Sequence, residues 1–312
     1  MGNKKKEKMT ANILNGKDIA QDIFEEVDLK VSDLKKSGWQ PMLLSIKVGE
    51  NPAVDLFIRN QRKKAEQVGI VFEEKQFPKD ISLNVLLAAI AGFNVDPKIT
   101  GIILQRPVPE NLPIKSLQKA IHPLKDVEGM HPASIGNIVY NELELGPCTA
   151  MASVELLRRT GKDLKGLEVV VIGHSEIVGK PIAFLLMAEG ATVTVCHHMT
   201  KDFTVHSKNA DAVFVAVGKP NLITGNMLKS GAILIDIGIN RITYDNGKSK
   251  IVGDSDFESC SKTAGWITPV PGGVGPLTVS CLMRNTVSAA IRLKKLYETQ
   301  FQSPVESGFE NI

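Results

Sequence analysis

Short apolar runs alternate along the chain with longer stretches whose apolar residues recur at helical spacing. Leu167 to Ile172 is such a short run, rich in β-branched residues and typical of a parallel strand covered on both faces. Gly173 follows it, and Gly179 opens an apolar segment, Ile182 to Met187, suited to a crossover helix. We therefore predict a strand, a sharp glycine turn and a helix whose first N–H groups could bind a phosphate.

Three further apolar runs follow this turn. The first, at 191–196, ends about 20 residues beyond the turn, where a nucleotide-binding unit usually presents the residue that recognises ribose. Two more buried-strand patterns, at 212–220 and 232–240, each run into a glycine. Four such strands with helical crossovers predict a doubly wound parallel sheet.

The first half of the chain repeats the alternation. Apolar residues at helical spacing from Ile19 to Val31 predict a first helix that ends near Gly38. The elements expected after it are a strand at 42–49, a helix at 52–69, a strand at 70–77, a helix at 81–93 and a strand at 101–109. This β-α-β-α-β series predicts a first α/β domain of about 150 residues, ahead of the sheet above.

Two loops could approach a ligand. The turn reads G-x-S-x-x-x-G, not G-x-G-x-x-G, and Pro181 stands where a P-loop has Ser or Thr, so an ordinary strand-to-helix turn is the alternative. Pro269 to Thr278 is rich in proline and glycine and precedes a long amphipathic helix. That loop allows close backbone approach, or else serves as a hinge between domains.

Composition narrows the class of protein. With 43% hydrophobic and 23% charged residues, the 312-residue chain resembles ordinary soluble proteins. Its net charge of +3 is small and the basic residues are scattered, except in Lys4 to Lys6, so we expect no nucleic-acid partner. No apolar run approaches the roughly 20 residues of a membrane span, and no signal peptide is recognisable. We expect a cytoplasmic protein without a membrane partner.

Cysteine and histidine spacing predicts no metal site. The four cysteines are far apart and form no C-x-x-C, so we expect reduced, mostly buried thiols. The six histidines show no ligand spacing. His197 and His198 are adjacent at a strand end and are expected to point in different directions.

Nine segments together resemble one family, methylenetetrahydrofolate dehydrogenase/cyclohydrolase. They occur in the family's order and cover nearly the whole chain. They are VGENPA (48–53), Gln105 with Pro107 and Pro109 in QRPVP, KDVEGMHP (125–132), GPCT (146–149), VIGHSEIVGKP (171–181), AVGKP (216–220), DIGIN (236–240), VGD (252–254) and PVPGGVGPLT (269–278).

The resemblance implies a two-domain α/β protein, usually a homodimer, that binds folate in a cleft between its domains. Residues 1–150 with 281–312 would form the catalytic, folate-binding domain, and residues 151–280 a Rossmann-type NAD(P)-binding domain. The family oxidises 5,10-methylenetetrahydrofolate by hydride transfer to NAD or NADP and then hydrolyses the methenyl product to 10-formyltetrahydrofolate.

The resemblance also assigns site residues. The implied cofactor-binding residues are Gly173, His174, Ser175, Ile177, Val178, Gly179, His198, Gly218 and Ile239. The implied substrate-binding residues are Val54, Pro271, Gly272, Gly273, Pro276 and Thr278.

The catalytic positions depart from the family pattern. The family's Tyr and catalytic Lys, four residues apart on one helix face, are Phe57 and Gln61 here. A lysine can shuttle protons during methenyl hydrolysis, whereas a glutamine amide does not titrate. Gln105, the family's partner of that Lys, remains and could pair with Gln61. The pterin-anchoring Asp is Glu128, and the family's Ser is Val54.

Cofactor choice depends on two histidines. NADP-using members carry an Arg after the turn glycine and a Ser at the next strand end, where this chain has His174 and His198. Neutral imidazoles would hold a 2′-phosphate poorly, yet no acidic residue stands at this strand end to favour a ribose hydroxyl. The balance favours NAD⁺ slightly, and both histidines could also be plain surface residues.

Four functions remain open at this point. The favoured one is a methylenetetrahydrofolate dehydrogenase whose cyclohydrolase activity is weak or lost, because hydride transfer mainly requires positioning. The others are a non-catalytic paralogue that acts as a binding partner or regulator, a full bifunctional enzyme with a rearranged site, and an oxidoreductase with another substrate.

Overall fold

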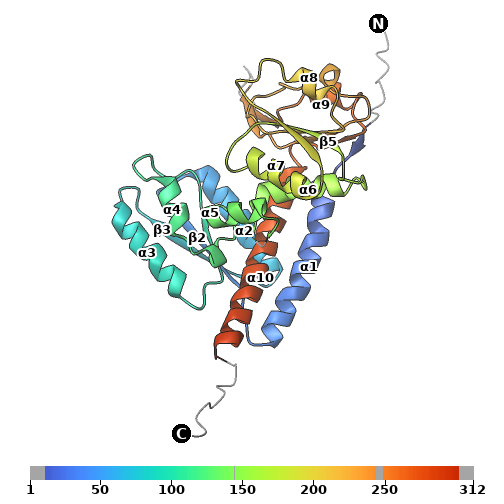
Figure 1. Ribbon diagram of the computed structural model, residues 1–312. Coiled ribbons are helices and arrows are strands. Elements are labelled where there is room, and N and C mark those ends of the chain that lie inside the picture. Colours follow the sequence, from blue (N-terminus) through green and yellow to red (C-terminus); the bar gives the residue numbers. More distant parts are fainter. Residues whose placement is uncertain (1–10, 144, 244–248, 302–312) are drawn as a thin grey trace, which may run out of the picture. The chain divides into compact units, whose positions relative to one another are not determined.

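The structure is a computed structural model that describes residues 11–143, 145–243 and 249–301 (Figure 1). The chain divides into two compact units. Unit 1 takes its described residues from Met1–Phe24 and Pro132–Leu282, and unit 2 from Glu25–His131 and Met283–Ile312. The helices α1 (Gly16–Lys36) and α10 (Val274–Phe301) therefore contribute residues to both units. The division predicted from the sequence, at residues 150 and 280, separates a folate-binding domain from a cofactor-binding domain. It stays a prediction.

Unit 1 contains a six-stranded parallel sheet. Its order is β1 (Asn12–Ile13), β11 (Trp266–Ile267), β8 (Ile233–Asp236), β7 (Ala212–Val215), β5 (Glu168–Ile172) and β6 (Thr192–Cys196). The four long strands confirm the predicted doubly wound sheet. The sequence missed β1 and β11, because strands of two residues leave no periodic pattern.

The strand order locates the switch point of this sheet. Counted from the β6 edge, the strands from β5 onward lie in the order β6-β5-β7-β8-β11. The chain therefore passes from β5 to β6 on one side and then to β7 on the other side of β5. In such sheets, ligands bind beyond the carboxyl ends of the strands where the order reverses. Here the reversal lies between β5 and β7, which pair from Val169 with Ala212 to Ile172 with Val215.

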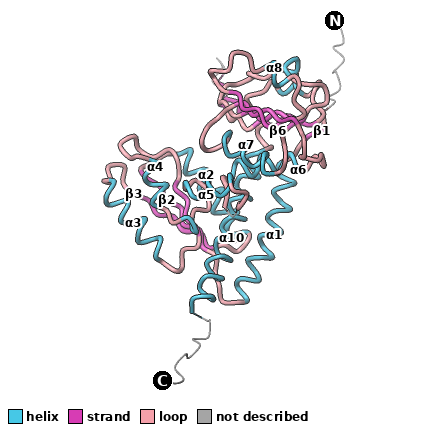
Figure 2. The backbone as a smooth tube through the Cα atoms, viewed as in Figure 1, coloured by secondary structure: helices cyan, strands magenta, loops and turns pink. Residues whose placement is uncertain are grey.

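Helices and one hairpin complete unit 1. Its short helices are α5 (Pro132–Val139), α6 (Cys148–Arg158), α7 (Gly179–Ala188), α8 (Thr204–Ser207), α9 (Phe257–Cys260) and the 3₁₀ turn η2 (Gly225–Met227). The antiparallel strands β9 (Asn240–Thr243) and β10 (Ser249–Val252) form a separate pair. Figure 2 separates these helices and strands by colour.

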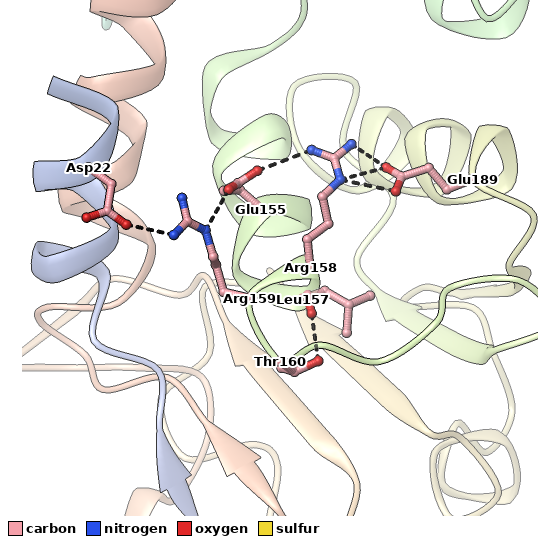
Figure 3. Close-up of polar contacts among 7 residues, drawn as sticks. All are labelled: Asp22, Glu155, Leu157, Arg158, Arg159, Thr160 and Glu189. Carbon is pink, nitrogen blue, oxygen red and sulfur yellow. Dashed lines mark hydrogen bonds and ion pairs between the residues drawn. The ribbon is translucent and has the colours of Figure 1, made fainter. Parts of the chain in front are cut away.

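An ion-pair network fixes the end of α6 (Figure 3). Arg158 binds Glu189 through two nitrogens, and its third nitrogen lies 3.3 Å from Glu155. Arg159 donates to Glu155 at 2.9 Å and to Asp22 of α1 at 2.7 Å. Burial alone would raise the pKa of Glu155, but the hydrogen bonds from Arg159 and Arg158 lower it. The network joins α6 to α1 and to the end of α7, the helix that follows the glycine turn.

All four cysteines lie in unit 1, are buried, and form no disulfide within the described residues. Burial, together with Asp256 and Asp236, raises the pKa of Cys260 to about 12. The prediction of reduced, buried thiols is confirmed.

Unit 2 is a smaller α/β unit around a three-stranded parallel sheet, β3-β2-β4. Its elements are β2 (Met42–Val48), α2 (Pro52–Gln67), β3 (Val71–Phe77), α3 (Leu83–Val95), β4 (Gly101–Leu104), α4 (Ile114–Ala120) and the 3₁₀ turn η1 (Pro123–Lys125). The central strand β2 is buried along its whole length, as expected of a strand paired on both edges. The predicted β-α-β-α-β series is confirmed.

Local sequence explains how α2 begins and which face it buries. Asn51 caps the helix by accepting hydrogen bonds from the N–H groups of Ala53 and Val54, and Pro52 occupies the first turn. The buried residues recur at helical spacing and are Val54, Ile58, Gln61 and Ala65. The glutamine is thus placed among apolar residues on the inner face of α2.

Several predicted boundaries were wrong. The strands expected at 101–109, 212–220 and 232–240 end at Leu104, Val215 and Asp236. The sequence placed Pro269 to Thr278 in a loop ahead of the last helix, but α10 begins at Val274. Pro276 and Thr278 therefore belong to the first turns of α10, and Thr278 Oγ1 donates to the Val274 carbonyl at 3.2 Å. Proline is tolerated there, because the first turn of a helix requires no intrahelical N–H donor from it. None of the helices among the described residues is long and apolar enough to cross a membrane.

Candidate functional site

The glycine turn after β5 is built by close backbone approach. Gly173 has a φ of +116°, and a Cβ on it would lie 2.3 Å from the carbonyl oxygen of Ala216, beyond β7. A Cβ on Gly179 would lie 1.9 Å from the Gly173 carbonyl oxygen. Both positions therefore require glycine, and they hold the start of α7 against the switch point of the sheet.

The loop between these glycines is folded by its own backbone. Ser175 accepts from the Val178 N–H through its hydroxyl at 3.2 Å and from the Lys180 N–H through its carbonyl at 3.1 Å. Val178 occupies the N-cap position of α7 and makes no side-chain capping bond. The first N–H groups of such a helix can donate hydrogen bonds to a phosphate, so the turn fits a dinucleotide.

Two buried aspartates fix the neighbouring loops. Asp254 accepts from the N–H groups of Val217 and Gly218 after β7, at 2.6 and 3.0 Å. Asp236 accepts from the N–H groups of Gly238, Asp254 and Ser255, at 2.9, 3.0 and 2.8 Å. Burial raises the pKa of Asp236, although these hydrogen bonds oppose the rise. Sequence reasoning found the motifs DIGIN and VGD but gave these carboxylates no role.

The remaining predicted cofactor residues also lie in unit 1. Gly218 adopts a φ of +67° in the loop that Asp254 holds. Ile177 and Ile239 are exposed, at 37% and 70% of their full areas, and so are accessible to a ligand.

Three histidines converge at the ends of β5 and β6. The rings of His197 and His198 lie 4.6 and 5.8 Å from that of His174, and 5.9 Å from each other, measured between centroids. The expectation that His197 and His198 point in different directions was wrong. The chain turns directly after β6, where the Thr200 N–H donates to the His197 carbonyl at 2.8 Å, and this turn brings both rings to one side.

The proline- and glycine-rich loop packs against the start of α1 within unit 1. The Gly16 N–H donates to the Gly272 carbonyl at 2.9 Å, and a Cβ on Gly16 would overlap the Gly273 carbonyl oxygen. A Cβ on Gly273 would lie 2.8 Å from the Cβ of Thr268. Pro271 stands beside Gly272 in this loop. The glycines are thus required for packing, whatever the loop binds.

The positions predicted to be catalytic lie in unit 2. Gln61 is 1% exposed, and its Oε1 accepts from Gln105 Nε2 at 2.8 Å. Gln105 Nε2 also donates to Ser45 Oγ at 2.9 Å. The amide pair expected from the sequence is therefore present. Phe57, one turn earlier on α2, is 45% exposed, so the two positions share a helix face but differ in burial.

Glu128 has a partner that sequence reasoning missed. Arg106 donates to Glu128 Oε1 at 2.7 Å. Desolvation raises the pKa of Glu128, Arg106 opposes that rise, and Asp126 adds to it. The available signal was an arginine directly after Gln105 in QRPVP, together with the longer carboxylate in KDVEG.

The structure thus groups the predicted residues by unit. Val54, Phe57, Gln61, Gln105 and Glu128 belong to unit 2. Val54, in place of the family's Ser, is 7% exposed on the inner face of α2. All predicted cofactor residues and the residues from Pro271 to Thr278 belong to unit 1.

Comparison with known proteins finds one family along both parts of the chain. The family model "Tetrahydrofolate dehydrogenase/cyclohydrolase, catalytic domain" matches residues 14–128, and its companion "NAD(P)-binding domain" matches residues 147–294. The Bifunctional protein FolD 2 of Mesorhizobium japonicum is 61% identical over 288 residues, which cover 92% of this chain and 94% of that protein.

Solved structures give the same result. The bifunctional FolD methylenetetrahydrofolate dehydrogenase/cyclohydrolase of Campylobacter jejuni superposes with a TM-score of 0.86 at 41% identity, covering 90% of this chain and 99% of that one. The Trypanosoma brucei enzyme, solved with NADP cofactor and inhibitor, has a TM-score of 0.85 at 34% identity, covering 90% and 98%.

Proposed function

Because the chain belongs to the tetrahydrofolate dehydrogenase/cyclohydrolase family, we propose that it is a 5,10-methylenetetrahydrofolate dehydrogenase whose cyclohydrolase activity is weak or lost. The observation that carries the second part is Gln61. A buried amide, bonded to Gln105, occupies the position of the family's catalytic lysine.

Dehydrogenation makes modest demands on side chains. The folate nitrogens already activate the methylene carbon, so the protein mainly has to hold that carbon in a near-attack geometry. When bound, NAD(P)⁺ supplies the hydride acceptor. The glycine turn suits this dinucleotide, because glycine at positions 173 and 179 lets backbone segments pack closely at the switch point of the sheet. Gly218 and the exposed Ile177 and Ile239 lie in the same unit.

Hydrolysis of the methenyl product demands more. Water must be deprotonated as it attacks, and a proton must reach the folate nitrogen as the ring opens. Gln61, Gln105 and Ser45 form a neutral hydrogen-bonded set in which no member titrates near neutral pH. Glu128 is engaged by Arg106 on another segment of unit 2. These contacts support a loss of proton transfer at this position.

A full bifunctional enzyme is the second candidate. It is favoured by the 61% identical relative, which is named as bifunctional. In that case another group, such as Glu128 with its raised pKa, would supply the proton transfer that Gln61 does not.

The deciding experiment separates the two steps. The purified chain is given 5,10-methylenetetrahydrofolate with NAD⁺ or NADP⁺, and reduced nicotinamide is followed by absorbance. In a second assay it is given 5,10-methenyltetrahydrofolate, and loss of the methenyl absorbance is compared with the uncatalysed rate. We expect turnover in the first assay and little acceleration in the second. Fast hydrolysis would establish the bifunctional enzyme, and no turnover by folded protein would favour a non-catalytic paralogue.

Gln61→Lys sharpens this test. A lysine at this buried position, without a carboxylate in the amide set, would have a lowered pKa and could shuttle protons. Because general acid–base catalysis contributes about 10²–10⁴-fold, we expect at least a tenfold gain in methenyl hydrolysis, and a larger gain when Phe57→Tyr is added. Gln67→Lys adds the same charge to an exposed position of α2 and serves as the control. No gain in Gln61→Lys would locate the lesion in folate binding.

The proposal has three further parts. A homodimeric assembly comes from the resemblance, and so does a slight preference for NAD⁺ over NADP⁺, because histidines replace the family's Arg and Ser. A location in the cytoplasm comes from the composition of the chain. Sedimentation of the purified chain tests the first, the paired cofactor assays the second, and fractionation of the source cells the third.

A further inference from the structure

His174, His197 and His198 converge in unit 1, and the proposed function uses only His174 and His198, as replacements for the family's Arg and Ser. His174 follows the glycine turn after β5, and the other two follow β6. One ring nitrogen from each can be chosen so that all three lie within 4.8 Å of one another. Among the described residues, this is the one group of three or more His, Cys, Asp or Glu side chains with that property.

The donor set has a definite chemical preference. Neutral imidazole nitrogens suit Zn²⁺, Cu²⁺ and Ni²⁺, whereas Mg²⁺ and Ca²⁺ prefer oxygen. Zn–N bonds of about 2.0–2.1 Å place tetrahedral ligands about 3.3 Å apart, so the nitrogens must approach slightly. His174 and His198 are exposed and His197 is half-buried, so small side-chain rotations can bring them together.

One local contact sets the tautomer of His197. Its Nδ1 accepts from the Met199 N–H at 3.2 Å, so Nε2 carries the ring proton in the absence of a metal. Binding a metal through Nε2 moves this proton to Nδ1 and breaks the hydrogen bond to Met199. A neutral imidazole is the form that binds metal.

We propose that His174, His197 and His198 bind one divalent transition-metal ion, with Zn²⁺ as the representative ion and water completing its coordination. Three protein ligands and an open position are a common arrangement for zinc. A bound ion would connect the β5–α7 turn to the end of β6. The proposal rests on side-chain geometry and is independent of the dehydrogenase assignment.

The test is direct metal binding to the untagged, metal-free full chain. Zn²⁺ is titrated in competition with a chromophoric chelator, and we expect one ion per chain. His174→Ala, His197→Ala and His198→Ala should each weaken binding at least tenfold. His206→Ala, which removes an exposed histidine of α8 in the same unit, should bind as the parent chain does. Zn²⁺ binding unchanged by all three cluster substitutions would overturn the proposal, as would the absence of binding.

A spectroscopic probe reports on the ligands. Co²⁺ in place of Zn²⁺ gives visible d–d absorption whose intensity depends on the coordination geometry. We expect these absorption bands in the parent chain and in the control His206→Ala, and we expect them to be absent in His198→Ala. Circular dichroism and thermal unfolding confirm that each variant folds. Bands identical in the parent chain and in His198→Ala would place the ion elsewhere and contradict the assignment.

Discussion

The glycine turn of unit 1 and the inner face of α2 in unit 2 differ in what determines their chemistry. In the turn, backbone atoms approach closely enough that only glycine fits at Gly173 and Gly179. On α2, side chains determine the chemistry, and the buried amide of Gln61 pairs with Gln105. A site built by backbone keeps its function through side-chain changes around it, whereas a site built by side chains loses a reaction when one is replaced.

The largest expected effect concerns the glycine turn of unit 1. In Gly179→Ala, the new Cβ would lie 1.9 Å from the Gly173 carbonyl oxygen, so the turn must open. We expect unit 1 to lose about 2–4 kcal/mol of stability, the range of severe backbone and packing conflicts. The measurement is the urea midpoint by circular dichroism, with dinucleotide affinity by fluorescence.

Gly136→Ala provides the matched control for that substitution. Gly136 lies inside α5, and a Cβ there would meet no atom within 4 Å. Alanine is favoured over glycine within helices by about 1 kcal/mol, so this variant should be as stable as the parent chain or more stable. Equal losses in both variants would contradict the close-approach argument.

A medium effect concerns Glu128. Its pKa is raised in the folded chain, so the folded state binds its proton more tightly than the unfolded state does. This contribution is fully present below the ordinary Glu value and is lost as pH rises through the folded pKa. One proton corresponds to a slope of at most about 1.4 kcal/mol per pH unit. We expect Glu128→Gln to remove that slope above pH 4.5, the ordinary pKa of a Glu side chain.

The Arg106→Leu variant tests the cause of the Glu128 shift. Arg106 opposes the rise in the pKa of Glu128, so its removal should raise that pKa further and extend the pH range over which stability falls. Urea unfolding at a series of pH values measures both variants. An Arg106→Leu profile identical to that of the parent chain would show that the ion pair contributes nothing to the shift.

The smallest effect concerns Ser45. Ser45→Ala removes one of the two acceptors of Gln105 Nε2, and the bond to Gln61 remains. A hydrogen bond of this kind contributes about 1 kcal/mol, so we expect a loss of that size in the stability of unit 2. Ser116→Ala, at an exposed position of α4, should change stability little. A loss in Ser116→Ala as large as in Ser45→Ala would remove the special role of the amide set.

Sequence patterns predicted the fold well where elements are long and periodic. The longer strands of both sheets follow from apolar runs, and the Gln61–Gln105 pair was expected from the family resemblance. The patterns failed where the structure depends on contacts distant in sequence. The two-residue strands β1 and β11 pair Asn12 with Trp266, and Arg106 reaches Glu128 from another segment. The start of α10 at Val274 was missed because glycines and prolines obscure the first turn of that helix.

The positions of the cysteines have a practical consequence. Cys148, Cys196, Cys260 and Cys281 are buried in unit 1, and unit 2 contains no cysteine in the whole sequence. A thiol reagent reacts with the thiolate, and the raised pKa of Cys260 suppresses this form in the folded chain. Labelling must therefore wait until unit 1 opens. The rate of thiol labelling therefore measures the opening of unit 1 alone. A ligand that binds the closed form of unit 1 would lower this rate in proportion to its occupancy.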